Sequence, residues 1–182
     1  MTSWTIAGSL TVERALDRPD LLADPVAKAL AELPAEHAER LGVAAIDPDL
    51  ADTAAFCEAY GSPLEHSANC VVVAGKRGGE VRYAALMVLA TMRADINGVV
   101  RRHLDVRKIS FAPQDEAVEL TGMEFGGITP VGLPDDWPVL VDPAVVAAGH
   151  VVIGSGIRGS KLLVPSVSLL DLPGAKELQL AQ

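Results

Sequence analysis

Two glycine-rich segments carry the residue spacing most suggestive of chemistry in this 182-residue chain. The first, residues 122–134, reads Gly-Met-Glu-Phe-Gly-Gly-Ile-Thr-Pro-Val-Gly-Leu-Pro, with four glycines and two prolines in thirteen residues. This composition restricts the backbone to one loop path at a cost in conformational entropy. The segment is equally consistent with a structural turn and with a loop whose amides stabilise an oxyanion or carbonyl of a ligand.

The second segment, Gly154-Ser-Gly-Ile-Arg-Gly159, matches the pattern G-x-G-x-x-G after a predicted strand. A dinucleotide-binding fingerprint needs a helix directly afterwards, then a second strand and an acidic residue about twenty positions on. Residues 161–164 instead have the character of a strand. We therefore interpret the glycines as a tight connection whose exposed amides line a pocket.

Nucleophile and metal motifs are weak by comparison. His66 and Cys70 are four residues apart, but Pro63 and the valine run that starts at Val71 argue against a helix that would bring them together. A buried cysteine at the start of a strand is the favoured interpretation over a Cys70 nucleophile with His66 as its base. No C-x-x-C, H-x-x-x-H, G-x-S-x-G or S-x-x-K motif occurs, so neither a zinc site nor a familiar serine nucleophile is expected.

Composition and charge place these segments in a globular protein. Hydrophobic residues make up 49% and charged residues 21%, so the chain can bury a core, and with 4% aromatics that core must be aliphatic. The net charge is −9, whereas proteins that bind nucleic acid over a broad surface are usually basic. Any contact with RNA must therefore use a local basic patch or a partner.

The N-terminal sequence lacks the basic and apolar regions of a signal peptide, and no apolar stretch reaches the ~18 residues of a membrane helix. Cys57 and Cys70 are expected to be reduced thiols. We therefore expect a cytoplasmic protein without a membrane partner.

Strands and helices interleave along the chain. β-Branched runs on both sides of Lys76-Arg-Gly-Gly79 predict a hairpin, and Asp24-Pro25 predicts a helix start. The helix predicted at 48–60 is expected to bury Leu50, Ala54 and Cys57. Strands are predicted at 70–74, 81–89, 108–111, 139–141, 151–153 and 161–164, and helices at 25–33, 36–41, 48–60, 95–104, 114–120, from 143 and at 166–170. This order favours an α/β fold of the α+β type, with a mixed, curled sheet and surrounding helices.

The glycine segments, together with the intervening Val-Leu-Val-Asp142, resemble the YbaK/EbsC family, the superfamily of the editing domain inserted in bacterial prolyl-tRNA synthetases. The most specific part is the Gly126-x-x-x-Pro130 loop, followed at the family's spacing by residues 154–161. The likeness covers about residues 47–172 of a single domain, 1–182. Residues 1–43 match no motif and are expected to form a helical N-terminal extension.

The resemblance implies a YbaK-like fold with a central pocket and trans-editing activity in translation fidelity. Such a freestanding aminoacyl-tRNA deacylase hydrolyses the ester that joins a wrong, small amino acid to the 3′ end of a tRNA. It uses no metal, cofactor or covalent intermediate: loop backbone groups hold the ester, and water attacks, often helped by the tRNA ribose hydroxyl. The implied partners are the mischarged tRNA 3′ end and, as a further candidate, an aminoacyl-tRNA synthetase. The resemblance assigns catalysis to Asn69, Gly126, Gly127 and Pro130, and substrate binding to Ile128, Thr129, Gly132, Asp142, Gly154, Ser155, Gly156 and Lys161.

One position departs from the family pattern. Many members carry a lysine where this chain has Asn69, whose amide can donate a hydrogen bond but supplies no positive charge. Lys76 lies in the predicted hairpin turn, several residues too late, and is interpreted as a solvated turn residue. Lys161 is a better substitute, because it begins a strand directly after the glycine connection, and it is equally consistent with a surface lysine. The departure leaves two hypotheses open: a deacylase with an altered site, or a non-catalytic module that binds an amino acid, a nucleoside or a protein. A positive group within reach of the loop 126–130 would favour the deacylase.

Three assignments have structural alternatives. Asp142 is expected either to anchor the glycine loop or to cap the following helix. Ser155 either contacts the ligand or is a turn serine. The basic cluster at 101–102 and 107–108 either meets the tRNA acceptor stem or is a solvated helix end.

Overall fold

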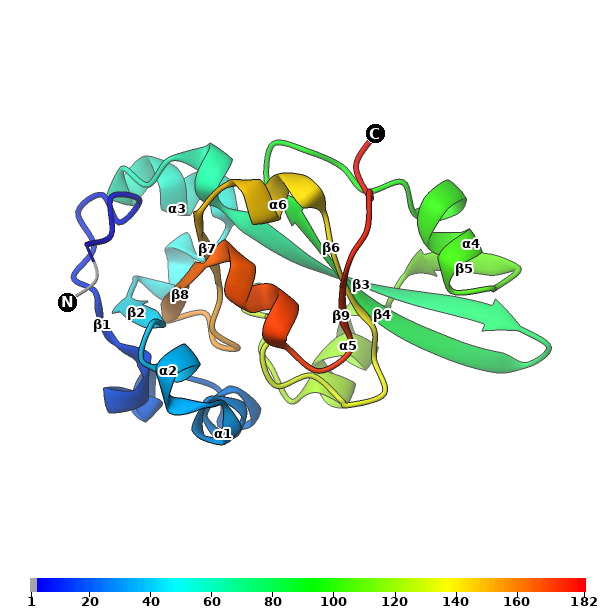
Figure 1. Cartoon of the computed structure of the whole chain (residues 1–182), viewed down its shortest axis with the longest axis horizontal. Helices are drawn as coiled ribbons and strands as arrows, with labels where there is room; N and C mark the ends of the chain where they lie inside the picture. The colour runs from blue at the N-terminus through cyan, green and yellow to red at the C-terminus, as the bar shows by residue number, and fades with distance from the viewer. Residues whose placement is uncertain (1–2) are drawn as a thin grey trace.

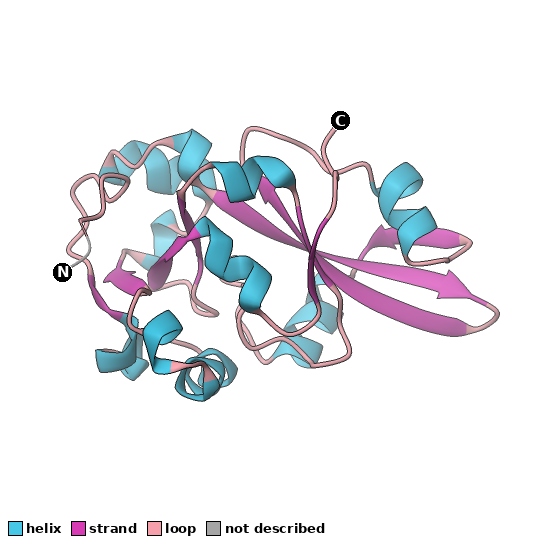
Figure 2. Cartoon of the chain, in the orientation of Figure 1, coloured by secondary structure: helices cyan, strands magenta, loops and turns pink. Residues whose placement is uncertain are grey.

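The computed structural model describes residues 3–182 as two β-sheets with helices packed around them (Figure 1, Figure 2). The first sheet has the order β1-β2-β8-β7 and the second the order β5-β3-β4-β6-β9. The predicted mixed α/β fold is confirmed: β4 and β9 pair in parallel with β6, and the other pairs are antiparallel. The strands are β1 (Glu13–Arg14), β2 (Gly42–Ala45), β3 (Ala68–Arg77), β4 (Glu80–Leu89), β5 (Lys108–Phe111), β6 (Val139–Val141), β7 (His150–Gly154), β8 (Ser160–Pro165) and β9 (Ala175–Glu177).

The two sheets meet where β3 begins. A parallel bridge joins Ser67, just before β3, to Val152 in β7. The start of β3 therefore lies beside the middle of β7, and the space on the open side of this junction is where the candidate site forms.

Strands β3 and β4 form the predicted hairpin. Arg77 pairs with Glu80, and the two intervening glycines, Gly78 and Gly79, have φ angles of 56° and 82°. Positive φ at both central residues is the requirement of a type I′ turn, which glycine meets without strain. The hairpin extends to the end of the molecule opposite the N-terminus (Figure 1).

The helices are short and are positioned by caps. They are α1 (Asp24–Glu32), α2 (Ala35–Ala38), α3 (Thr53–Tyr60), α4 (Arg101–His103), α5 (Gln114–Thr121) and α6 (Pro143–Ala147), with short 3₁₀ segments and one π-helical segment, Ile96–Val100, elsewhere. The continuous helix predicted at 48–60 is divided, because the Asp47 carboxylate caps a 3₁₀ turn, Pro48–Leu50, and Asp52 then caps α3 separately. This shift changes the buried face of α3: Phe56 is buried, and the predicted Ala54 is exposed.

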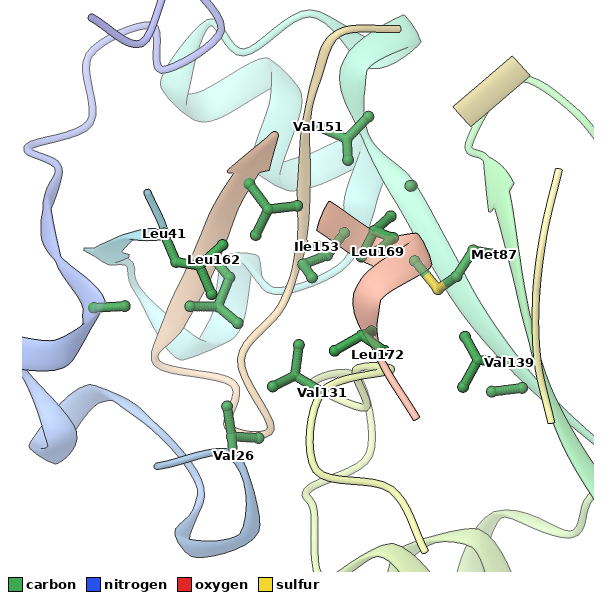
Figure 3. Packing of buried hydrophobic residues seen from close by; sticks show 14 of the residues in the cluster. Val26, Leu41, Met87, Val131, Val139, Val151, Ile153, Leu162, Leu169 and Leu172 are labelled. Atoms are coloured by element: carbon green, nitrogen blue, oxygen red, sulfur yellow. The ribbon is translucent and has the colours of Figure 1, made fainter. Parts of the chain in front are cut away.

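An aliphatic core fills the space between the sheets and α1 (Figure 3). Val26 and Leu30 of α1 and Val43 of β2 pack in it against β7 and β8. Of the segment 1–43 that was expected to form a helical extension, the described residues 3–43 therefore also contain the unpredicted strand β1 and pack into the main core. The proposed division between this extension and a core at 47–172 stays a prediction.

Within residues 3–182, no helix is long and apolar enough to cross a membrane.

Asp142 follows β6 and is almost fully buried. One carboxylate oxygen accepts from the Ala144 amide at 2.8 Å and so caps α6, and the other accepts from the amides of Leu180 and Ala181 at 2.9 and 2.8 Å. Of the two interpretations of Asp142, the helix cap is the one observed, and the carboxylate anchors the C-terminal segment rather than the glycine loop.

Replacing Asp142 by alanine leaves these three amide groups without their acceptor, and all three are in buried or half-buried surroundings. We expect Asp142→Ala to lower the free energy of unfolding by about 2–4 kcal/mol. Chemical denaturation measures this, with the exposed Asp135→Ala as the matched control. Equal stability of the two variants would contradict the anchoring role.

Candidate active site

A cavity of about 420 Å³ opens between the start of α3, the start of β3, the end of β7 and the first glycine segment. Five residues expected to act in the site line it: Asn69, Gly126, Ile128, Gly154 and Lys161. They come from four separate parts of the chain, and the fold brings them to one cavity.

The two glycine segments are joined directly through their backbones. The Gly156 amide donates to the Gly127 carbonyl at 2.7 Å, and the Glu124 amide donates to the Gly156 carbonyl at 2.9 Å. Gly126 has a φ of +85° in a turn closed by the Gly127 amide and the Glu124 carbonyl at 3.0 Å, a geometry that favours glycine. The loop predicted from the first segment is therefore held rigidly by the second.

Gly154 makes this junction possible because it has no side chain. A Cβ atom at this position would lie 2.5 Å from the Gly127 carbonyl oxygen and 2.7 Å from that of Ile128. Gly127 is equally confined, since its Cβ would lie 2.7 Å from the Ile157 carbonyl oxygen. Both glycines are required for close backbone approach.

Lys161 places a buried cation on the wall of the cavity. Its side chain donates from Nζ to the Ala51 carbonyl at 2.8 Å, and Nζ lies 5.4 Å from the centre of the Phe56 ring. Burial lowers the pKa of Lys161 below its usual 10.5, opposed in part by the nearby Cys57 and Asp52. The hydrogen bond and the aromatic face compensate part of the cost of burying the charge.

Arg158 is a second cation at the same cavity, and sequence analysis missed it. Its guanidinium donates to the carbonyl oxygens of Phe125 at 3.2 Å and Pro48 at 3.0 Å, so it links the glycine turn to the segment before α3. A positive group therefore lies within reach of the loop 126–130. The available signal was its position inside the second glycine segment, where we had weighed only the glycines and Ser155.

Asn69 stands at the start of β3 and faces the cavity. Its side-chain oxygen accepts a hydrogen bond from the Thr53 hydroxyl at 2.9 Å. This contact fixes the amide orientation and leaves the NH₂ group available to donate to a ligand.

Other predicted residues support the loop from behind and are not part of the cavity wall. Thr129 and Pro130 are buried, and Gly132 packs on α1, where a Cβ would lie 2.5 Å from the Pro25 carbonyl oxygen. Gly156 also packs on the start of α1, against Ala23.

Ser155 is fully buried and hydrogen-bonds inside its own turn, to the carbonyl oxygens of Ile157 and Ser160, each at 3.1 Å. These contacts match the interpretation of Ser155 as a turn serine rather than as a residue that contacts the ligand.

The cysteine alternative does not fit this geometry. Burial raises the pKa of the Cys70 thiol to about 12, so the thiolate is disfavoured. His66 is engaged elsewhere, with Nδ1 2.9 Å from the His150 carbonyl oxygen. Within residues 3–182, no three His, Cys, Asp or Glu side chains are grouped so that they could hold a metal ion.

Comparison with known proteins decides the family. The model of the aminoacyl-tRNA editing domain matches residues 47–172. The chain belongs to this family. The matched interval contains every residue that lines the cavity, whereas α1, which supports Gly132 and Gly156, lies outside it.

Solved structures share the editing-domain fold. A candidate trans-editing enzyme for prolyl-tRNA synthetase is 22% identical with a TM-score of 0.72, over 88% of this chain and 99% of the other. A scaffold protein from computational epitope grafting gives the same identity, score and share of this chain, over 97% of its own length. A hypothetical protein is 23% identical with a TM-score of 0.64, over 72% of this chain and 85% of its own. No curated protein matches the sequence.

The contact of Gly154 with the glycine loop yields a prediction for this editing domain. In Gly154→Ala the new Cβ overlaps two carbonyl oxygens, so the loop must move, and we expect a loss of about 1–3 kcal/mol in the free energy of unfolding. Gly159→Ala is the matched control in the same segment, because the nearest atoms to its Cβ would be 3.9 Å away. Thermal or chemical unfolding of both variants measures the difference, and equal stability would refute the close approach.

Proposed function

We propose that this editing-domain protein is an aminoacyl-tRNA deacylase that acts in trans on tRNA carrying a small, wrongly attached amino acid. The observation that carries the proposal is the convergence of the rigid glycine loop, Arg158 and Lys161 on one cavity. An ester carbonyl develops negative charge when water attacks it, and fixed donors and cations at that point lower the barrier.

The glycine loop offers the donors. Within residues 3–182, the amides of Gly126 and Ile128 donate to no oxygen of the chain, although both residues line the cavity. In the proposed reaction these amides donate to the oxyanion of the tetrahedral intermediate. Because the Gly156 amide holds the Gly127 carbonyl, the donors need little reorganisation as charge develops.

Lys161 and Asn69 complete the proposed site. Lys161 supplies the positive charge that Asn69 lacks at the usual family position, and its burial reduces screening of that charge by solvent. The Asn69 NH₂ group, oriented by Thr53, donates to the terminal ribose or the ester. Water adds to the ester carbon, the bond to the ribose oxygen breaks, and that oxygen takes a proton, which releases a free amino acid and an intact tRNA.

The cavity dimensions support a small amino acid. The 420 Å³ must receive both the aminoacyl group and the ribose, and Ala51, Phe56, Ile128 and Val152 bound it with apolar side chains. Such walls discriminate by about 1–3 kcal/mol per methylene, so a larger side chain is rejected by size.

The first experiment is a deacylation assay with tRNAs mischarged with Ala, Ser, Thr and Cys, in the presence of a metal chelator. We expect the wild type to hydrolyse at least one of these tRNAs with chelator present, because no side chain of the proposed mechanism needs a metal. We expect Asn69→Ala to lower kcat/KM by about tenfold or more, since one hydrogen bond to the substrate is lost.

The wild type on a correctly charged tRNA and a reaction without protein are the controls. Hydrolysis of none of the mischarged tRNAs would overturn the proposal and favour the non-catalytic binding module. An unchanged rate for Asn69→Ala would show that Asn69 has no role in the site, but the proposed deacylase activity would stand.

The lowered pKa of Lys161 predicts the shape of the pH profile. The charge is present below the pKa and is lost as pH rises through it, and this pKa lies below 10.5. After subtraction of spontaneous ester hydrolysis, the wild-type rate should therefore fall on the alkaline side earlier than an exposed lysine would allow.

Two variants of Lys161 test this profile. Lys161→Met should lower kcat by about 10²-fold and abolish the alkaline fall, and Lys161→Arg should abolish the fall by keeping its charge. The exposed Lys176→Met is the matched control and should behave as wild type. A Lys161→Met enzyme with the wild-type rate and profile would exclude Lys161 from the reaction.

A further inference from the structure

Positive charge is concentrated at one end of this acidic protein. Eight of the fifteen lysine and arginine residues lie between positions 76 and 108, together with three of the twenty-four acidic residues. The fold brings the two ends of this interval together, because the tip of the β3–β4 hairpin lies beside α4 and β5 (Figure 1). Sequence analysis had noted residues 101–102 and 107–108, but it had treated Lys76 as a solvated turn residue.

A groove of about 440 Å³ lies at this tip. Four basic residues line it: Lys76, Arg77, Arg107 and Lys108. Gly78 and Gly79 form part of its wall and have no side chains, so another molecule can approach the backbone closely. The Arg107 amide donates to the Lys76 carbonyl at 2.9 Å, which fixes the two sides of the groove relative to each other.

The charges in the groove are poorly balanced by the protein itself. Lys76 of β3 and Lys108 of β5 are direct cross-strand partners, an arrangement in which like charges destabilise a sheet. Arg77 pairs with Asp105, but within residues 3–182 Lys76, Arg107 and Lys108 form no ion pair. Arg101 and Arg102 of α4 are also exposed and form no ion pair within residues 3–182, although Arg102 is near enough to Asp95 to help lower the pKa of that carboxyl. An anionic ligand would supply the missing counter-charge.

We propose that this hairpin groove (Lys76, Arg77, Arg107 and Lys108) binds the sugar–phosphate backbone of the tRNA whose 3′ end enters the cavity. The inference rests on the proposed deacylase function and adds the surface that receives the rest of the substrate. Lysine and arginine side chains around bare backbone suit phosphate contacts, which position a nucleic acid without reading its sequence.

Strand β3 connects the groove to the cavity. Asn69 faces the cavity and Lys76 lines the groove, seven residues further along the same strand, a span of ~23 Å at ~3.3 Å per residue. In the proposed binding mode, the tRNA places its terminal ribose in the cavity and follows this span, first as single strand and then as acceptor stem. The acidic remainder of the surface repels phosphates, so the groove also orients the tRNA.

The test compares a groove variant, Lys76→Gln/Arg107→Gln/Lys108→Gln, with a matched control, Lys28→Gln/Arg40→Gln/Lys176→Gln. The control removes three exposed positive charges elsewhere that form no ion pair within residues 3–182, and so changes the net charge equally. Two substrates are used: a full-length mischarged tRNA and an aminoacylated 3′-terminal tetranucleotide too short to reach the groove.

For the full-length tRNA we expect the groove variant to raise KM at least tenfold and to reduce the slope of log(kcat/KM) against log[salt] by about 2–3. For the tetranucleotide its kcat/KM should equal that of the wild type, and the control should match the wild type on both substrates. The unfolding temperature of the groove variant should not fall, because the substitution removes a like-charge pair.

Binding of labelled, uncharged tRNA separates this inference from the proposed function. If the wild type hydrolyses nothing but the groove variant still binds tRNA more weakly than the control, the deacylase proposal fails and the groove assignment stands. If the groove variant binds and hydrolyses full-length tRNA as the wild type does, the groove assignment is overturned, and an acidic protein surface becomes the ligand to test.

Discussion

The candidate site depends on one backbone contact, the hydrogen bond from the Gly156 amide to the Gly127 carbonyl. It joins two residues that are 29 positions apart in the sequence and that belong to different parts of the fold. Because Gly154 and Gly127 lack side chains, the segments approach until backbone meets backbone. The same approach carries Arg158 to the glycine turn and places Lys161, three residues later, on the cavity wall.

The position of the positive charge follows from how the two sheets meet. The cavity is lined by β3 of one sheet and by β7 and β8 of the other, so a cation can reach it from either side. In this chain the β3 position is Asn69, and the buried cation comes from Lys161 in β8. The Ala51 carbonyl and the Phe56 ring, both on the α3 side, stabilise the ammonium group there. The proposed reaction therefore keeps a positive charge near the ester without a lysine at position 69.

Sequence patterns predicted the elements whose signals are local. The Gly78-Gly79 turn, the Asp24-Pro25 helix start and the β7–β8 pair are all present. Strands β1, β2 and β9 were missed because they have two to four residues, few of them β-branched, and are defined by their partners rather than by their own sequence.

For the candidate site, too, the sequence predicted only the features that have local signals. The glycine segments were recognisable from the sequence. The burial of Phe56, in contrast, depends on the separate N-cap at Asp52, and the hydrophobic periodicity of residues 48–60 did not reveal this cap. The role of Arg158 depended on which carbonyl oxygens the fold brought to it. The part of the chain that lies outside the family match also supports the candidate site. Helix α1 supports both glycine segments, through Pro25 against Gly132 and Ala23 against Gly156, although neither contact lies in the cavity. A loop that must hold amides in place during a reaction needs rigid packing on its far side, because free movement would spread the donors over many positions. The N-terminal segment is therefore part of the mechanical support of the proposed site.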